Sequence, residues 1–295
     1  NLGAGLWTEH EVFDLGTSPT ALYDVDVAFG QGADLSVACA IAVRDASGDV
    51  EWRYNAWLTP TFAFNIETVM ATLPFPPSLL DESAGVALAF HDGAGADRVH
   101  AILTVTGRDA ADVEFTDVHQ TGADDKGLLT SFDAPTLITT RTYETASMDF
   151  AADPDGDTFV YVSDPFEGFV STNGGASWVP LALEGGATPE FARLRWLGGD
   201  FALAGVRGPT FEREGVEYRP DGAATGTWSE RILLPGLGSV AAPISVADDP
   251  SRPGETAAVV RAAAYQDPSS SVGRIWYNAT WRDAIGYGVL EGDAP

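Results

Sequence analysis

An aromatic residue that opens a short strand with alternating polar residues recurs along the whole chain. It occurs at Trp7, Trp52, Phe115, Trp178 and Trp228, so successive copies are 45 to 63 residues apart. A repeat of this length is typical of small sheets that each need neighbours to cover their faces. The spacing therefore predicts an all-β fold, a β-propeller with one four-stranded sheet per repeat and five blades.

Other segments also have the composition of strands. Residues 23–29, 85–90, 158–162 and 257–263 are apolar or alternating and rich in Val, Phe and Tyr, and clusters of Asp, Gly and Pro separate the predicted strands. No segment combines apolar residues at helical spacing with helix caps. The chain is therefore expected to contain strands and turns almost throughout.

The two ends of the chain are expected to meet. Three predicted strands follow Trp228, one fewer than a blade needs, and the strand around Trp7 can supply the fourth as an outer strand. This pairing would close the propeller, leave no unpaired sheet edge and make residues 1–295 a single domain. Six blades are an alternative to five if residues 59–83 or 120–144 contain an irregular sheet. A two-sheet sandwich is the alternative fold.

The charge of the chain limits its partners. Forty-three Asp and Glu stand against 16 Lys and Arg, which gives a net charge of −27 that repels phosphate backbones and anionic lipids. No run of about 18 apolar residues could span a membrane. We therefore expect neither nucleic-acid binding nor membrane insertion.

Several features favour a secreted protein, extracellular or periplasmic. The chain is acidic, has one lysine and begins at Asn1 rather than Met, as a chain without its leader would. Cys39, the single cysteine, lies in an apolar run and is interpreted as a small buried hydrophobe. A single cysteine excludes an internal disulfide and a thiolate metal cluster.

One segment resembles a known repeat. Ser171 to Trp178 is similar to the Asp-box, or bacterial neuraminidase repeat, with the pattern Ser-x-Asp-x-Gly-x-Thr-Trp. Three positions match: Ser171, Gly175 and Trp178. Two differ, since Asn173 replaces Asp and Ser177 replaces Thr. Residues 218–228 look like a second, distorted copy.

The resemblance implies a fold more than an activity. Asp-box propellers include sialidases, other glycosidases, lectins and non-enzymatic assembly factors. In that family the box caps a hairpin and its Trp packs between blades, so the resemblance supports a sialidase-like propeller. Sialidases also carry an Arg-Ile-Pro segment near their first strands, which this sequence lacks.

Propeller topology predicts one face for a site. In a propeller, the connection from the outer strand of one blade to the inner strand of the next lies on the same face as the turn between the second and third strands of a blade. Residues 59–83 and 120–144 are predicted to be connections of this kind. Candidate ligand-binding residues for a glycan are the charged and aromatic residues Arg141, Tyr143, Asp164, Glu167 and Arg207, with Trp57 and Trp276 for stacking on a sugar. If the protein is a glycoside hydrolase, the catalytic candidates are Glu144, Tyr265 and Asp267.

An acidic turn is a candidate calcium site. Asp153, Asp155 and Asp157 could supply hard oxygen ligands, although Thr158 stands where a calcium loop has glycine. Such an ion would be structural and lie opposite the proposed ligand face. No other cofactor is expected.

Three functions remain open from the sequence. The first is a secreted, acidic β-propeller that binds a glycan or another extracellular ligand on its long-loop face. The second is a glycoside hydrolase, sialidase-like or otherwise based on carboxylates. The third is a non-catalytic structural or assembly module whose partner is an extracellular protein. Carboxylates about 5 to 9.5 Å apart in one site would favour the hydrolase.

Overall fold

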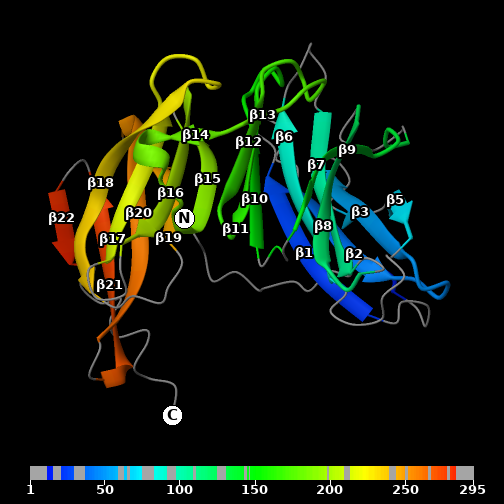
Figure 1. Ribbon diagram of the computed structural model, residues 1–295, viewed down its shortest axis with the longest axis horizontal. Helices are drawn as coiled ribbons and strands as arrows, with labels where there is room; N and C mark the ends of the chain where they lie inside the picture. Colours follow the sequence, from blue (N-terminus) through cyan, green and yellow to red (C-terminus); the bar gives the residue numbers. More distant parts are fainter. Residues whose placement is uncertain are drawn as a thin grey trace. The chain divides into compact units, whose positions relative to one another are not determined.

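In a computed structural model, the described part of the chain consists of β-strands, turns and one short 3-10 turn, η3 (Glu184–Gly186) (Figure 1). The structure describes residues 12–15, 21–29, 37–58, 63–64, 67–74, 83–91, 98–108, 111–124, 131–142, 145, 147–197, 199–208, 213–238, 244–249, 252–264, 267–277 and 280–283. Within these residues the strands form five sheets. The chain divides into two compact units, Asn1–Glu144 and Thr145–Pro295.

The first unit holds two antiparallel sheets. The first sheet contains β1 (Ala21–Phe29), β2 (Val37–Arg44), β3 (Val50–Leu58) and β4 (Ala63–Phe64), with β5 (Thr68–Leu73) also paired to β3. The second sheet contains β6 (Ser83–His91), β7 (Arg98–Arg108), β8 (Glu114–Ala123) and β9 (Thr136–Arg141). Consecutive strands pair in both sheets, except that β4 and β5 both pair with β3.

The second unit holds three sheets. The third sheet contains β10 (Ser147–Ala152), β11 (Phe159–Asp164), β12 (Glu167–Ser171) and β13 (Val179–Pro180). The fourth contains β15 (Glu190–Leu197), β16 (Asp200–Arg207), β17 (Arg213–Pro220) and β18 (Thr227–Gly238), with β14 (Ala182–Leu183) parallel to β18 at its edge. The fifth contains β19 (Ile244–Asp249), β20 (Arg252–Ala264), β21 (Asp267–Tyr277) and β22 (Thr280–Asp283).

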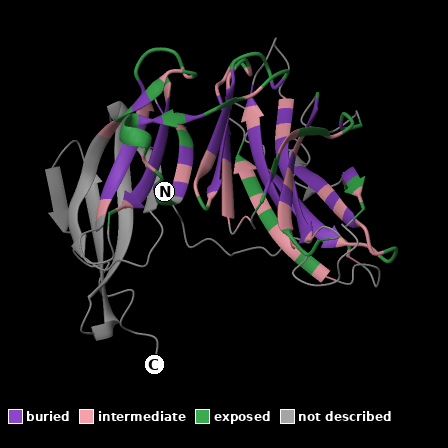
Figure 2. Cartoon of the chain, viewed as in Figure 1, coloured by how far each residue is buried: buried purple, intermediate pink, exposed green. Residues whose placement is uncertain are grey.

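The sheets of each unit pack face to face with their neighbours. The first strands of consecutive sheets are neighbours, β1 with β6, β10 with β15, and β15 with β19. The second strands β2, β7, β11 and β16 are buried along most of their length (Figure 2). Because β2 carries Val, Ile and Ala and β16 carries Phe, Leu, Val and Ala over both faces, neither face is suited to water.

Large aromatic residues fill the space between sheets. In the first unit, Trp52 is fully buried, and its indole Nε1 donates a hydrogen bond to the Gly85 carbonyl of the second sheet at 3.0 Å. In the second unit, Tyr218 and Trp228 of the fourth sheet are fully buried in a cluster with Val160 of the third. Trp52 and Trp228 thus pack between neighbouring sheets of their units, whereas the Asp-box residue Trp178 is partly buried and its ring centroid lies 6.4 Å from that of Phe159 in its own sheet. Five sheets of four or five strands, packed against their neighbours within each unit, form the predicted propeller fold.

The aromatic repeat marks different strands in the two units. Trp52 and Phe115 lie on the third strands β3 and β8, whereas Trp178 directly precedes the fourth strand β13 and Trp228 lies on the fourth strand β18. All strands of a sheet share the same two-residue period, so alternation alone does not tell a third strand from a fourth. The predicted connections 59–83 and 120–144 consequently contain strands, namely β4, β5 and β9.

The predicted closure involves residues outside the described ones. Residues 1–11, which include Trp7, are not among those described, so their pairing with the last sheet stays a prediction, as does a single domain over residues 1–295. The fifth sheet has a fourth strand of its own in β22, where the sequence analysis expected three. The segment that follows residue 11 is bound to the first sheet, because Asn55 Nδ2 donates to the Val12 carbonyl at 2.6 Å.

Candidate functional site

The topology gathers most of the predicted site residues at the same end of their own sheets. We call this the second-turn end, where the second and third strands are joined and the chain leaves the fourth strand. Five candidates terminate or begin strands there: Arg141, Asp164, Glu167, Arg207 and Asp267. Trp57 and Trp276 lie near the other ends of β3 and β21. Their place follows from these strands being third strands, so the two Trp residues do not share an end with the charged candidates.

Several candidates stay predictions. Tyr143, Glu144 and Tyr265 lie outside the described residues. For Trp57, Trp276 and Asp267, the structure describes the strand but not the side chain.

Arg207 is engaged within its own sheet. Its Nη1 lies 2.6 Å from Glu230 Oε2, and its Nη2 lies 3.2 Å from an oxygen of Glu214, the residue directly opposite on β17. The Tyr218 hydroxyl donates to the same Glu230 oxygen at 2.9 Å, and burial, followed by this carboxylate, raises the pKa of Tyr218. Two carboxylates therefore offset the charge of Arg207. Arg141, directly opposite Thr116, is 3% exposed and lies in the packed interior.

Asp164 and Glu167 flank a tight turn between β11 and β12. The Ser163 hydroxyl donates to the carbonyls of Pro165 at 3.1 Å and Glu167 at 3.3 Å, which fixes the turn. Both acidic side chains are partly exposed. They are accessible carboxylates on a rigid support.

The acidic turn uses one of its carboxylates internally. Asp153 Oδ1 accepts hydrogen bonds from the main-chain N–H groups of Asp157 at 3.0 Å and Thr158 at 3.1 Å. Among the described residues, no three His, Cys, Asp or Glu side chains form a group that could hold a metal ion. Calcium binding by Asp153, Asp155 and Asp157 stays a prediction.

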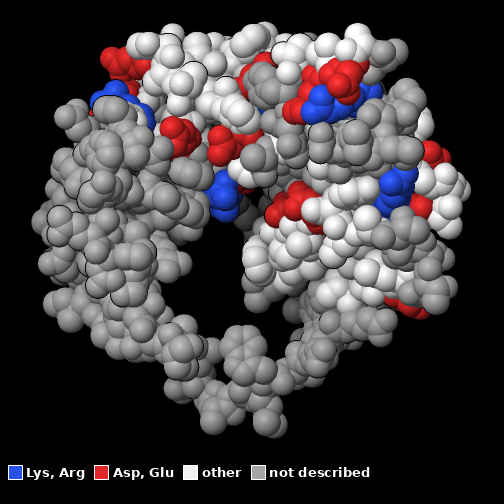
Figure 3. All heavy atoms as spheres, turned by 60° about the horizontal axis from the view of Figure 1, so that its bottom comes forward, with Lys and Arg blue, Asp and Glu red and all other residues white. Residues whose placement is uncertain are grey.

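Basic side chains on the described surface lie beside acidic ones (Figure 3). Arg98 Nε is 2.8 Å from Asp124, and Arg53 Nη1 is 2.9 Å from Glu67. Exposed pairs of this kind add little stability. Their effect is to offset positive charge locally in a chain with a large acidic excess.

Charged residues inside the first strands form the candidate site that the sequence analysis missed. In the first unit, Asp24 and Asp26 on β1 accept hydrogen bonds from the main-chain N–H groups of Val86 at 3.0 Å and Leu88 at 2.7 Å on β6. In the second unit, Asp149 on β10 accepts one from Leu194 on β15 at 2.9 Å. Each carboxylate thus links a first strand to the first strand of the next sheet.

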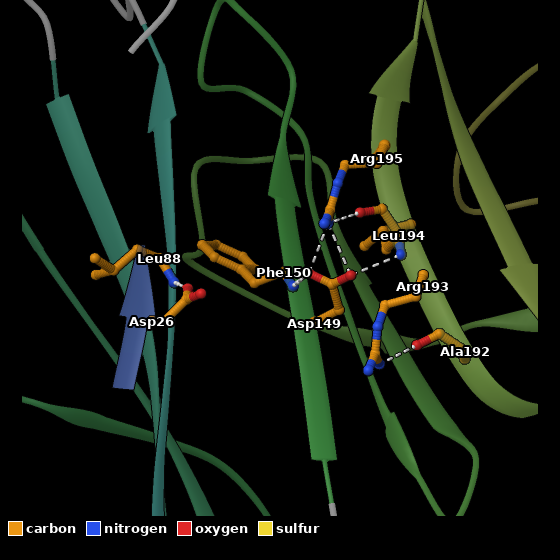
Figure 4. Close-up of polar contacts among 8 residues, drawn as sticks. All are labelled: Asp26, Leu88, Asp149, Phe150, Ala192, Arg193, Leu194 and Arg195. Carbon is orange, nitrogen blue, oxygen red and sulfur yellow. Dashed lines mark hydrogen bonds and ion pairs between the residues drawn. The ribbon is translucent and has the colours of Figure 1, made fainter. Parts of the chain in front are cut away.

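Asp149 also holds a guanidinium group. Figure 4 shows Asp149 directed from β10 towards Arg195 on β15. Arg195 Nη1 lies 3.0 Å from Oδ1 and 2.8 Å from Oδ2 of Asp149, and it donates to the Leu194 carbonyl at 2.6 Å. The Arg195 side chain is 49% exposed, whereas the Asp149 side chain is 15% exposed. One nitrogen therefore fixes the guanidinium while half of the side chain faces solvent.

Burial and charge oppose each other at these carboxylates. Burial raises the pKa of Asp149, while Arg195 and then the Leu194 N–H act to lower it. Burial also raises the pKa of Asp24, against hydrogen bonds from the Val86 and Val25 N–H groups. Chemically, an oriented guanidinium can donate paired hydrogen bonds to a carboxylate or another planar anion.

The sequence does contain a weak signal for these residues. Asp24 and Asp26 interrupt the strand at 21–29, and Asp149 interrupts a short apolar strand. Polar residues at alternate positions are equally expected of a half-buried strand, so the pattern alone does not indicate a site.

The sheets and their packing within each unit define the fold, a β-propeller. No protein-family model matches the sequence, and no curated protein matches it. Among solved structures, the chain is similar to the Hadza microbial sialidase Hz136, with a TM-score of 0.53 at 12% identity over 90% of this chain and 58% of that one.

The chain is also similar to the polysaccharide lyase Uly1. That similarity has a TM-score of 0.52 at 8% identity, over 86% of this chain and 58% of the lyase chain. This chain therefore spans little more than half of the length of either structure, and likeness at these identities shows the fold alone. Among the described residues, no helix is long and apolar enough to cross a membrane.

Proposed function

We propose that the protein is a carbohydrate-binding β-propeller and that it recognises an acidic sugar through Arg195. The observation that carries the proposal is the geometry of this side chain. Asp149 and the Leu194 carbonyl hold Nη1, while the side chain is 49% exposed on a first strand. A guanidinium that is oriented in advance loses less side-chain entropy when it binds a carboxylate.

The fold supports carbohydrate as the ligand. Two of the similar solved structures are named as a sialidase and a polysaccharide lyase. These names denote different reactions, so the shared fold favours binding of carbohydrate without selecting one reaction. For this reason binding, rather than a particular hydrolysis, is the function proposed.

The hairpin between β12 and β13 supports the Asp-box interpretation. Asn173 Oδ1 accepts the Ser177 N–H at 2.9 Å, and the Ser171 hydroxyl accepts the Gly175 N–H at 2.9 Å. The Asn side chain thus caps the turn as an Asp would in the repeat. We also propose that the protein is secreted, in keeping with its acidic surface.

The test is binding of acidic and neutral sugars to matched variants. A glycan array with titrations should detect uronic or sialic acids, and Arg195→Ala should weaken binding about 10-fold to 100-fold, the range for a charge-assisted hydrogen bond. Arg98→Ala removes a similarly exposed ion-paired arginine in the other unit and should leave affinity unchanged. Equal loss in both variants would argue against the site.

The other two functions give different results. A hydrolase would turn over aryl glycosides, and Glu144→Gln or Asp267→Asn would abolish that turnover. An assembly module would give no saturable glycan signal and would retain a protein partner through a large buried interface.

A further inference from the structure

Asp149 depends on Arg195 for its charge. Three groups donate hydrogen bonds to this carboxylate: the Leu194 N–H, the Phe150 N–H and Arg195 Nη1. Of these, only Arg195 is charged, and burial of the carboxylate favours its neutral form. The second charged group that acts on Asp149 is Arg193, whose Nη1 donates to the Ala192 carbonyl at 2.9 Å.

An anion bound to Arg195 would change this balance. It would offset the guanidinium charge and place a second negative charge close to Asp149. Both effects favour protonation of a carboxylate. A protonated Asp149 can still accept the Leu194 N–H through its carbonyl oxygen, so the link between β10 and β15 would persist.

We propose that binding of a carboxylate ligand at Arg195 is coupled to uptake of a proton by Asp149 from solvent, so that the site binds acidic sugars more tightly as pH falls. The proposal rests on the proposed function and adds its regulation. Asp149 is then a positioning residue: it orients Arg195 and stores the proton, while Arg195 contacts the ligand.

The thermodynamic linkage between ligand binding and protonation fixes how steeply the affinity depends on pH. If a full proton is taken up, the association constant rises by about tenfold for each unit of decrease in pH, and a fractional uptake gives proportionately less. The gain ends where the carboxylate of the ligand itself becomes protonated, at about pH 3.5. The window therefore begins above that value and ends at the pKa that Asp149 has in the complex.

Isothermal titration calorimetry measures how many protons the protein takes up when the ligand binds. Sodium glucuronate is titrated into the full chain at pH 5.5 in MES and in Bis-Tris, two buffers that lack a carboxylate and differ in ionisation enthalpy, with glucose as the neutral probe. The difference in binding heat between buffers gives the number of protons taken up. We expect a value clearly above zero and at most one, and an affinity that falls between pH 5.5 and pH 7.5.

Asp149→Asn separates Asp149 from other titrating groups. Asn keeps an acceptor for the Leu194 N–H but cannot take up the proton, so the variant should bind glucuronate with no proton uptake and little pH dependence. Glucuronate binding without proton uptake in the wild type would overturn the coupling and leave the proposed function standing, and an unchanged uptake in Asp149→Asn would overturn it too. No binding of glucuronate or other acidic sugars would overturn both. If the variant does not fold, the wild-type proton count alone decides.

Discussion

His100 on β7 lies in a space that a glycine provides. Its Nδ1 is 3.2 Å from Nε2 of His91 on β6, and a Cβ at Gly122 on β8 would lie 2.8 Å from its ring. Burial, with smaller effects from His91 and Arg98, lowers the pKa of His100 from 6.5 to about 3. The second sheet is therefore built around an uncharged imidazole.

The protein should lose stability in weak acid because of His100. Since the folded-state pKa lies below the unfolded-state value, the unfolded chain binds more protons between pH 6.5 and pH 3. The contribution of His100 is complete above pH 6.5 and decreases by up to about 1.4 kcal/mol per pH unit as pH falls. Urea unfolding at pH 7, 6 and 5 measures this slope.

His100→Gln is the matched variant for that slope. It should unfold with a shallower dependence on pH than the wild type, even if it is less stable at pH 7. Asp24 and Asp149 act in the opposite direction, because burial raises their pKa values and protonation then favours the folded state. An identical slope in the two proteins would contradict the role of His100.

Gly122→Ala should destabilise the protein through the same contact. Overpacking of this kind costs about 1–3 kcal/mol, because the His100 ring must move to admit the new methyl group. The double variant Gly122→Ala/His100→Ala should recover part of the loss. A double-mutant cycle with no coupling would show that the two positions do not interact.

Single residues were the hardest part to predict. The buried state of Cys39 was predicted correctly from its apolar neighbours and is observed. The partners of Asp149 were not predictable, because Leu194 and Arg195 are more than 40 positions away and no local pattern encodes a contact between sheets. The engagement of Arg207 by Glu230 was also missed, because these residues lie on β16 and β18, two strands of one sheet that are separated by β17, and the alternation pattern does not report which strands become neighbours.

At the level of elements, the β12–β13 hairpin allows the capping of its turn by the Asn173 side chain to be tested. Asn173→Ala removes the acceptor for the Ser177 N–H and should lower stability by about 1 kcal/mol, the usual contribution of one or two hydrogen bonds. Asn173→Asp restores the acceptor found in the Asp-box pattern and should leave the melting temperature almost unchanged. Calorimetric melting of both variants checks this, and equal losses would contradict the capping role.

Strand existence was predictable, whereas strand rank within a sheet was not. The composition of β1, β6, β11 and β20 indicated strands, and each is one. The fourth strand β4 has only two residues, and β5 joins the same partner β3, so neither has a recognisable alternation. The alternation pattern also did not indicate that Trp57 and Trp276 lie at the opposite end of their sheets from the charged candidates.

For the whole molecule, the net charge of −27 should make stability depend on salt. Screening shortens the range of charge repulsion to about 8 Å at 0.15 M ionic strength, so NaCl should raise the melting temperature. CaCl2 at the same ionic strength serves as the comparison. A melting temperature that is higher in CaCl2 than in NaCl, with a difference that Asp155→Asn removes, would establish the predicted calcium site. Equal melting temperatures in the two salts would count against it.

The number of sheets was the most predictable property of the whole molecule. Five aromatic repeats predicted five sheets, and the described strands form five. Trp52, Phe115, Trp178 and Trp228 lie in or directly beside strands of the first four sheets, one per sheet. Division of the chain near residue 144 has no counterpart in the sequence pattern. Compactness depends on contacts between sheets, and the repeat spacing does not report them.

The segment at 12–14 is held by its backbone. Asn55 binds the Val12 carbonyl, Arg53 Nη1 lies 3.4 Å from the Asp14 carbonyl, and Glu67 accepts the Asp14 N–H at 3.3 Å. These hydrogen bonds involve main-chain groups of residues 12–14, so they do not depend on which side chains stand at these positions. Substitutions at residues 12–14 should therefore be tolerated, whereas Arg53, Asn55 and Glu67, which bind this segment, should not be replaced freely. The exception is proline at position 14, which would remove the N–H group that donates to Glu67.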